Sequence, residues 1–297
     1  MDQVTRYLVH EGRASLIIAR TTDLVEKIRN IHDLTPTTTA AMGRFATISG
    51  MMGFSDIKEN DDSISIQIKG DGQMGSLISV IRRIDNTTII KMCCDNPHVE
   101  PPLKANGKLD VGAAVGRTGF LNVIKKNDLT NADYNGLVPL VSGEIAEDFT
   151  DYYAKSKQIP TVLSLGVLVN KDGTKAAGGY LLQLMPDATE EDIVKIEEAS
   201  KEVKPISQMI DENIELDEIA KMVSGDPNAI PIEEKLEIKY ECDCDKEKFK
   251  KGIISLGKEE ITKIIEEDGH AEIECHFCKK KYDFSKSELE NLRQKAK

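Results

Sequence analysis

Four cysteines in the last quarter of the sequence have the type and spacing of a metal site. Cys242 and Cys244 form a Cys-x-Cys pair, and Cys275 and Cys278 form a Cys-x-x-Cys pair after thirty intervening residues. Thiolates bind zinc at about 2.3 Å in tetrahedral geometry, and two such pairs supply four ligands without leaving an open catalytic position. The spacing therefore predicts one Zn²⁺ held by all four sulfurs.

Two alternatives to this interpretation stay open. His276 lies inside the second pair and His270 just before it, so a Cys₃His site is one alternative, although four correctly spaced thiolates need no substitute. The other is a zinc ribbon that only stabilises a small domain, which is the commoner role of paired cysteines.

Two features favour a redox role over a purely structural one. Only Asp243 separates Cys242 from Cys244, so a disulfide between them would be a small, strained and readily reduced ring. An acidic helical segment lies directly upstream, where a metal-folded domain could hold it in place. Oxidation removes thiolate ligands, so the metal and the folding energy it supplies would be lost together. We hypothesise that the zinc domain is a latch.

We interpret the remaining cysteines on the expectation that the protein resides in a reducing compartment. The N-terminal residues lack the features of a secretory signal, and no apolar run approaches the roughly 18 residues of a membrane span, so we expect a cytosolic protein. Disulfides are rare there. Cys93 and Cys94 are adjacent in a β-branched stretch, and we interpret them as buried, inert thiols because one pair cannot complete a zinc site.

The elements that must position these residues are predicted to form an α+β fold. Alternating β-branched runs and turn residues predict strands over Ala14–Ala19 and over residues 63–92, and Asp172-Gly173 is typical of a hairpin turn. Helices are expected over Thr37–Gly53 and from Ser142 onward. These elements indicate a large, mainly antiparallel β domain with helices.

The chain of 297 residues is predicted to have three segments. Residues 1–185 form the α+β core domain. Residues 186–231 form an acidic helical linker with a net charge of −9, and its apolar stripe over residues 193–223 can hold helices only by packing on neighbours. Residues 232–297 form a small C-terminal domain, of a size at which a metal often replaces part of the core.

Several other patterns carry little functional weight. Gly70 to Gly75 matches G-x-G-x-x-G, but the β-branched residues that follow predict a β-turn instead of the helix that dinucleotide binding needs. Ser142 lacks the glycines of a nucleophile elbow, and His10, His32 and His98 have no partner evident in the sequence.

Charge argues against nucleic acid as a partner. The formal net charge is −12, and binding to phosphate backbones depends on Lys and Arg. Lys279, Lys280 and Lys281 lie next to aromatic residues but within an acidic domain, so we expect a solvated face. A zinc-ribbon nucleic-acid module is therefore disfavoured. A thiol-disulfide oxidoreductase would need an exposed Cys-x-x-Cys at a helix start, without zinc.

The sequence as a whole closely resembles the redox-regulated 33 kDa heat-shock chaperonin family, which are bacterial holdases. Besides the cysteine pairs, the resemblance rests on Ala19-Arg20-Thr21-Thr22, Pro36–Arg44, Lys69–Gly75, Asn106–Gly116, Val138–Phe149 and Leu165–Gly173. It implies a cytosolic chaperone, not an enzyme, that is inactive when reduced and bound to zinc.

The resemblance also implies a mechanism. Oxidants acting with heat would form the disulfides Cys242–Cys244 and Cys275–Cys278, release zinc and unfold the linker. The oxidised protein would dimerise and bind unfolded clients through residues 1–185, hold these clients without ATP, and later pass them to ATP-dependent chaperones. No nucleic acid or membrane is involved. Cys93 and Cys94 lie outside this motif and leave room for an additional oxidation event.

Overall fold

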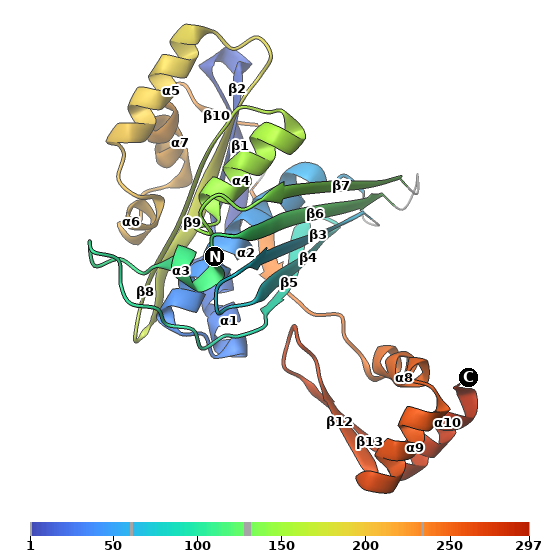
Figure 1. The fold of residues 1–297 in the computed structure, drawn as a ribbon. Helices are drawn as coiled ribbons and strands as arrows, with labels where there is room; N and C mark the ends of the chain where they lie inside the picture. The colour runs from blue at the N-terminus through green and yellow to red at the C-terminus, as the bar shows by residue number, and fades with distance from the viewer. Residues whose placement is uncertain (1, 60–61, 128–131, 233–234, 297) are drawn as a thin grey trace. The chain divides into compact units, whose positions relative to one another are not determined.

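The computed structural model describes residues 2–59, 62–127, 132–232 and 235–296 (Figure 1). The chain divides into two compact units, Met1–Tyr240 and Glu241–Lys297. Each unit has its own hydrophobic core.

A large β-sheet organises the N-terminal unit. Within the described residues it has eleven strands, of which ten follow the order β7-β6-β3-β4-β5-β11-β1-β2-β9-β8, and β10 pairs with β1. All its pairings are antiparallel except the parallel pair of β5 and β11, which confirms the mainly antiparallel prediction. The strands are β1 (Gln3–Val9), β2 (Ala14–Arg20), β3 (Ser63–Gly70), β4 (Ser76–Ile84), β5 (Thr87–Cys94), β6 (Gly119–Asn127), β7 (Ala132–Pro139), β8 (Thr161–Asn170), β9 (Gly173–Leu184), β10 (Ile230–Pro231) and β11 (Leu236–Tyr240).

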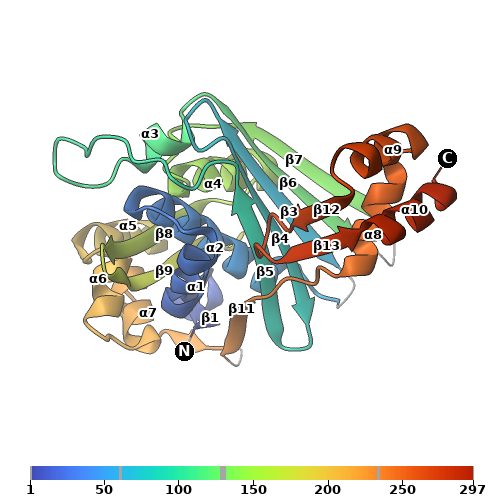
Figure 2. The same ribbon diagram turned by 90° about the horizontal axis from the view of Figure 1, so that it is seen from below.

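Helix α2 (Pro36–Asp56) forms the centre of the main core and contains the predicted helix over Thr37–Gly53. The helix has small and apolar residues on all of its sides, so nearly every one of its side chains is buried. At Gly53 an added Cβ would lie 2.6 Å from side-chain atoms of Ile81 and Thr88, so the absence of a side chain lets the helix approach the sheet. Helix α1 (Thr22–His32) lies beside α2 (Figure 2).

The helix predicted to begin at Ser142 begins four residues later, as α4 (Ala146–Tyr152), and continues into a turn of π-helix, η2 (Tyr153–Lys157). The carboxylate of Asp148 accepts hydrogen bonds from four backbone N–H groups of residues 141–145, and Gly143 and Ile145 have positive φ. These bonds hold the segment as a loop. The other short elements of this unit are η1 (His10–Gly12) and α3 (Val111–Val115).

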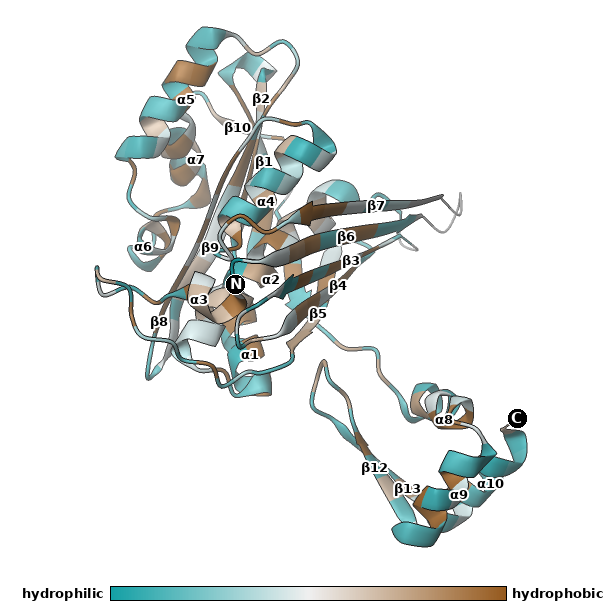
Figure 3. Ribbon diagram, viewed as in Figure 1, coloured by the Kyte–Doolittle hydropathy of each residue, from teal (hydrophilic) through white to brown (hydrophobic). Residues whose placement is uncertain are grey.

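The acidic segment 186–231 contains three helices that pack on the sheet. These are α5 (Glu190–Glu202), α6 (Ile206–Asp211) and α7 (Leu216–Ser224), and Pro205 separates the first two. They lie next to β8 and β9 in both ribbon views (Figures 1 and 2), and α5 is mostly hydrophilic (Figure 3).

A second hydrophobic cluster, here called the linker cluster, joins these helices to the sheet. The sheet contributes Tyr7, Val9, Ala14, Leu16, Ile18, Ala176, Tyr180 and Leu182, and the helices contribute Ile196, Ile206, Met209, Ile210, Leu216, Ile219, Ala220 and Val223. The helices therefore obtain their core from the sheet, as their weak apolar content predicts.

The C-terminal unit is a β-hairpin with three helices. Its elements are α8 (Lys246–Ser255), α9 (Lys258–Glu267), β12 (His270–Glu274), β13 (Lys281–Ser285) and α10 (Lys286–Lys295). The core is small and includes Ile253, Ile261, Ile265, Tyr282, Phe284, Leu289, Leu292 and Ala296.

The compact units differ from the three predicted segments. Strand β11 pairs with β1 and β5, so the division falls between Tyr240 and Glu241 instead of at residue 232. The segment 186–231 belongs to the larger unit because its helices share a core with the sheet. The roles predicted for the three segments stay predictions.

Candidate metal centre

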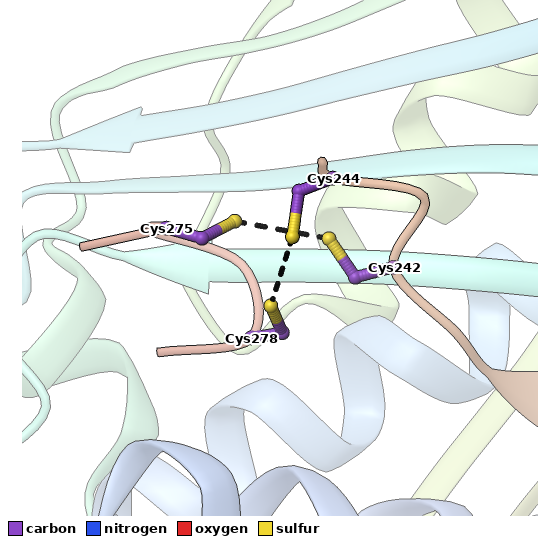
Figure 4. Close-up of side chains that lie close together, drawn as sticks. All are labelled: Cys242, Cys244, Cys275 and Cys278. Carbon is purple, nitrogen blue, oxygen red and sulfur yellow. Dashed lines mark hydrogen bonds between the residues drawn. The ribbon is translucent and has the colours of Figure 1, made fainter. Parts of the chain in front are cut away.

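Two loops of the C-terminal unit bring the four cysteines together (Figure 4). Cys242 and Cys244 lie in the loop before α8, where the Asp245 side chain accepts a hydrogen bond from Lys248 N–H and caps the helix. Cys275 and Cys278 lie in the turn between β12 and β13, which the bond from Lys279 N–H to the Cys275 carbonyl closes at 2.8 Å. Local capping and turn formation thus orient both pairs.

The four sulfurs point toward a common centre (Figure 4). The Sγ atoms all lie within 4.8 Å of one another, with 3.7 Å between Cys242 and Cys275 and 3.3 Å between Cys244 and Cys278. A tetrahedron with metal–sulfur bonds of about 2.3 Å has edges of about 3.8 Å. The cluster therefore fits one tetrahedral, thiolate-bound ion, and it could hold a metal.

Hydrogen-bond donors surround the sulfurs. Burial raises the pKa of the Cys242 thiol and of the Cys278 thiol, against the backbone N–H groups of Cys244 and Lys280 that donate to them. Burial also opposes ionisation of Cys244, but hydrogen bonds, first among them that of Tyr282, hold its pKa below the ordinary value. The surroundings of Cys244 thus favour the thiolate more than those of Cys242 and Cys278 do.

Tyr282 was not among the residues predicted from sequence. Its hydroxyl lies 2.9 Å from the carbonyl oxygen and 3.2 Å from the Sγ of Cys244, and the hydrogen bond to Cys244 raises the pKa of the phenol. An aromatic residue four positions after a Cys-x-x-Cys pair was the available signal, but it also suits an ordinary core residue.

Other candidate residues lie elsewhere. Within the described residues, neither His270 nor His276 joins the cysteine cluster, and the His270 ring contacts the Asp268 carbonyl at 3.0 Å. Cys93 and Cys94 are half-buried, so the prediction that both are buried is wrong. Adjacent side chains of strand β5 point to opposite faces, and only Cys94 packs against the main core.

The other discounted residues have structural roles. Residues Asp71–Gly75 connect β3 to β4, so the glycine-rich motif is a turn as predicted. His10 Nε2 lies 2.9 Å from the Ser224 carbonyl oxygen, and His32 Nε2 lies 3.2 Å from the Tyr240 hydroxyl.

Polar contacts supplement the linker cluster. Arg13 donates two hydrogen bonds to the Asp192 carboxylate. The Tyr7 hydroxyl donates to Asp217 at 2.7 Å. The backbone N–H of His10 donates to the Asp226 carboxylate at 2.6 Å. The guanidinium of Arg13 holds the pKa of the Asp192 carboxyl far below its usual range. The two residues of each pair are 179, 210 and 216 positions apart, so sequence spacing gave no signal for these contacts.

Comparison with known proteins shows the family of this chain. The family model described as "Hsp33 protein" matches residues 2–285. The chain belongs to the Hsp33 family. It is 40% identical to a 33 kDa chaperonin of Bacillus velezensis over 296 residues, covering 99% of this chain and 98% of the relative. It is also 40% identical to the 33 kDa chaperonin of Bacillus subtilis over 294 residues, with the same coverage.

A solved member of the Hsp33 family has the same fold. The crystal structure of the 33 kDa chaperonin, a heat shock protein 33 homolog, from Thermotoga maritima matches with a TM-score of 0.89 and 32% identity. The match covers 99% of this chain and 98% of that one. The α+β prediction and the resemblance to this family are confirmed.

Membership of the Hsp33 family supports a chaperone function, and the relatives' names imply a non-enzymatic role that involves unfolded client proteins. The cysteine cluster is compatible with zinc and with thiol redox chemistry. Among the described residues, no helix is long and apolar enough to span a bilayer.

Proposed function

We propose that this chain is a redox-regulated, ATP-independent holdase whose C-terminal unit senses oxidants. In the reduced state, Cys242, Cys244, Cys275 and Cys278 hold one Zn²⁺. Zn²⁺, when bound, would cross-link the two loops and supply folding free energy to the unit. The single observation that carries the proposal is the convergence of four sulfurs within 4.8 Å in a chain of the Hsp33 family.

Oxidation would remove the ligands. The family resemblance implies pairing within each motif, as Cys242–Cys244 and Cys275–Cys278. The contacts between motifs, at 3.7 Å for Cys242 with Cys275 and 3.3 Å for Cys244 with Cys278, would then be replaced by bonds within each motif, so the sulfurs would no longer link the two loops. Loss of Zn²⁺ and of the structure of the unit would follow.

The linker 186–231 is the segment proposed to respond. Unfolding of α5, α6 and α7 would uncover the sheet side of the linker cluster, whose members include the fully buried Tyr7, Leu16 and Ile18. Apolar surface binds unfolded chains because its burial is favourable by about 25 cal/mol per Å². Clients would be held there until thiols are restored and ATP-dependent chaperones take over.

Further expectations accompany this proposal. The oxidised protein is expected to form a homodimer, and the protein is expected in the cytoplasm. Cys275 and Cys278 lie in a hairpin turn and not at a helix start, which gives an oxidoreductase little support. Lys279 pairs with Glu274, and Lys281 pairs with Glu272, so these cations favour a neutralised surface over nucleic-acid binding.

One experiment tests the proposal. Zinc content, free thiols and suppression of client aggregation are measured on the same protein before and after mild peroxide with heat. We expect one Zn²⁺ per reduced chain, loss of four thiols with the metal, and protection only after oxidation. Replacing all four cysteines by serine should abolish metal binding and the peroxide response. A reduced protein without metal, or a serine variant still activated by peroxide, would contradict the proposal.

A further inference from the structure

Two lysines of the N-terminal unit, Lys125 and Lys157, share one carboxylate. Lys125 belongs to β6, Lys157 is the last residue of η2, and Asp56 is the last residue of α2. The Nζ of Lys125 donates to an oxygen of the Asp56 carboxylate, and the Nζ of Lys157 lies 3.7 Å from the same oxygen. Three elements that are distant in the sequence thus bring two amino groups to one anion.

An aromatic ring also connects the two amino groups. Tyr134 of β7 lies directly opposite Lys125 in the sheet. The centroid of its ring is 5.9 Å from the Nζ of Lys125 and 5.2 Å from the Nζ of Lys157. The Tyr134 hydroxyl is bonded to the Ser156 Oγ at 2.7 Å, which fixes the ring between the strand and η2. The two Nζ atoms are therefore held as neighbours.

This cluster has an imbalance of charge. One carboxylate neutralises one ammonium group, so two ammonium groups beside Asp56 leave one positive charge in excess. The side chains of Lys125 and Lys157 are only 17% and 25% exposed, so water screens that charge poorly. Loss of one proton removes the excess, and a neutral amine can still donate a hydrogen bond to Asp56.

Lys125 is the residue whose surroundings favour this loss. Burial, and after it the neighbouring ammonium group of Lys157, lower the pKa of Lys125 to about 6. An ordinary lysine is almost entirely protonated at pH 7 and has no lone pair with which to react. The neutral form of a lysine is a nucleophile. Lys125 therefore combines the reactive protonation state with a side chain that solvent still reaches.

The same cluster favours an electrophile of one charge type. A half-buried group of two lysines and one carboxylate attracts anions. Small acyl phosphates are anionic acylating agents, whereas simple esters are neutral. We propose that Lys125 is an acylation site that reacts with small acyl phosphates. The inference is independent of the proposed function, because these residues and the four cysteines belong to different compact units.

The reaction needs no oxidant and no further reactant. The Lys125 Nζ attacks the carbonyl carbon of the acyl phosphate, and the bond from that carbon to the phosphate oxygen breaks. Inorganic phosphate leaves with the electron pair of that bond, and the nitrogen releases one proton to water as the amide forms. The amide no longer ionises, so Lys157 and Asp56 remain as a balanced pair.

The test treats the full-length protein with acetyl phosphate and compares Lys125 with Lys126. Lys126 is the next residue of β6 and is exposed, since its side chain points to the opposite face of the strand. After denaturation the unreacted amines are labelled with deuterated acetic anhydride, and tandem mass spectrometry measures the acetylated fraction at each lysine. At pH 7 we expect Lys125 to react about tenfold faster than Lys126.

The pH dependence gives a second, independent measurement on the unsubstituted protein. Between pH 7 and pH 8 the rate at Lys126 should rise about tenfold, because the neutral fraction of an ordinary lysine rises by that factor. The rate at Lys125 should change less than about twofold, because most of this group is already neutral at pH 7.

Two variants test the role of the neighbouring charge. Lys157→Gln removes the second ammonium group, so Lys125 should hold its proton more tightly and react several-fold more slowly at pH 7. Lys155→Gln is the matched control, because Lys155 lies in the same segment η2 but pairs with Asp151, and it should leave the rate at Lys125 unchanged.

Three outcomes would overturn the inference. They are a rate at Lys125 no greater than that at Lys126, a tenfold rise at both lysines between pH 7 and pH 8, or an unchanged rate at Lys125 in Lys157→Gln. If Lys157→Gln did not fold, the first two comparisons would decide, because both use the unsubstituted protein.

Discussion

Arg13 and Asp192, which are 179 positions apart, form a paired contact between the turn that precedes β2 and the linker. The Arg13 Nε donates to one carboxylate oxygen at 2.7 Å, and Nη2 donates to the other at 3.1 Å. The Asp192 carboxylate also accepts from Thr189 and closes the capping box of α5. One carboxylate thus fixes the start of the helix and attaches it to the core domain.

Replacing Arg13 with Gln should loosen the linker in the reduced protein. The substitution removes the charge and the bidentate geometry that hold Asp192, and leaves a buried carboxylate with fewer donors. Trypsin should then cleave several-fold faster after the linker lysines Lys195, Lys201 and Lys221. Arg29→Gln is the control, since Arg29 pairs with Glu26 on its own helix. Equal linker cleavage in the two variants would show that the contact between Arg13 and Asp192 does not hold the linker in place.

Two positions on helix α5 distinguish the effect of side-chain burial from the effect of a substitution on the helix itself. Ile196 is 2% exposed and belongs to the linker cluster, whereas Val194 is 51% exposed. Ile196→Ala should cost about 2 to 5 kcal/mol of docking free energy, and Val194→Ala less than about 0.5 kcal/mol. We expect reduced Ile196→Ala to bind a hydrophobic dye and suppress client aggregation without oxidant. If Val194→Ala behaved the same way, burial of the Ile196 side chain would not explain how the linker docks on the sheet.

The sequence predicted well those features that depend on short-range patterns. Strand alternation, the hairpin turn before Gly173 and the apolar, small-residue helix over Thr37–Gly53 all appear in the structure. The cysteine pairs were found because metal ligands need fixed residue types at fixed spacing. The start of α4 was misplaced because four backbone donors converge on Asp148, and this loop geometry has no periodic signal.

Contacts between distant residues could not be predicted in this way. Tyr282 next to Cys244 and Arg13 next to Asp192 depend on how loops and strands meet in space. The pairing of strand β11 with β1 and β5 could not be predicted for a related reason, because these strands are far apart in the sequence. The partial exposure of Cys93 could not be predicted either, because a strand residue can face either side of the sheet.

Removing the metal should unfold the C-terminal unit without oxidation. The unit spans residues 241–297 and has a small core, and a domain of about this size is only marginally stable. A strong chelator added to reduced protein should abolish hydrogen-exchange protection in α8, α9 and α10, and Zn²⁺ should restore it. Amides of α2 in the other unit serve as an internal control. Full protection of the three helices in metal-free protein would show that the apolar core is sufficient.

Asp2 should give the N-terminal unit a measurable pH dependence. Burial raises the pKa of this carboxyl to about 6, even though the backbone N–H groups of Leu24 and Asp23 donate to it. The unfolded value is lower, so the folded state binds more protons between about pH 4 and pH 6. This group's contribution to the free energy of unfolding therefore falls as the pH rises through that range, by roughly 2 to 3 kcal/mol at most.

Asp2→Asn isolates that contribution, because other carboxyls, such as Glu144 with its lowered pKa, change stability with pH in the opposite direction. Urea unfolding of the reduced, zinc-bound protein at pH 4.5 and pH 7 should show that Asp2→Asn stabilises the N-terminal unit more at pH 7 than at pH 4.5. If Asp2→Asn shifted the unfolding midpoint equally at both pH values, Asp2 would titrate no differently in the folded and unfolded states.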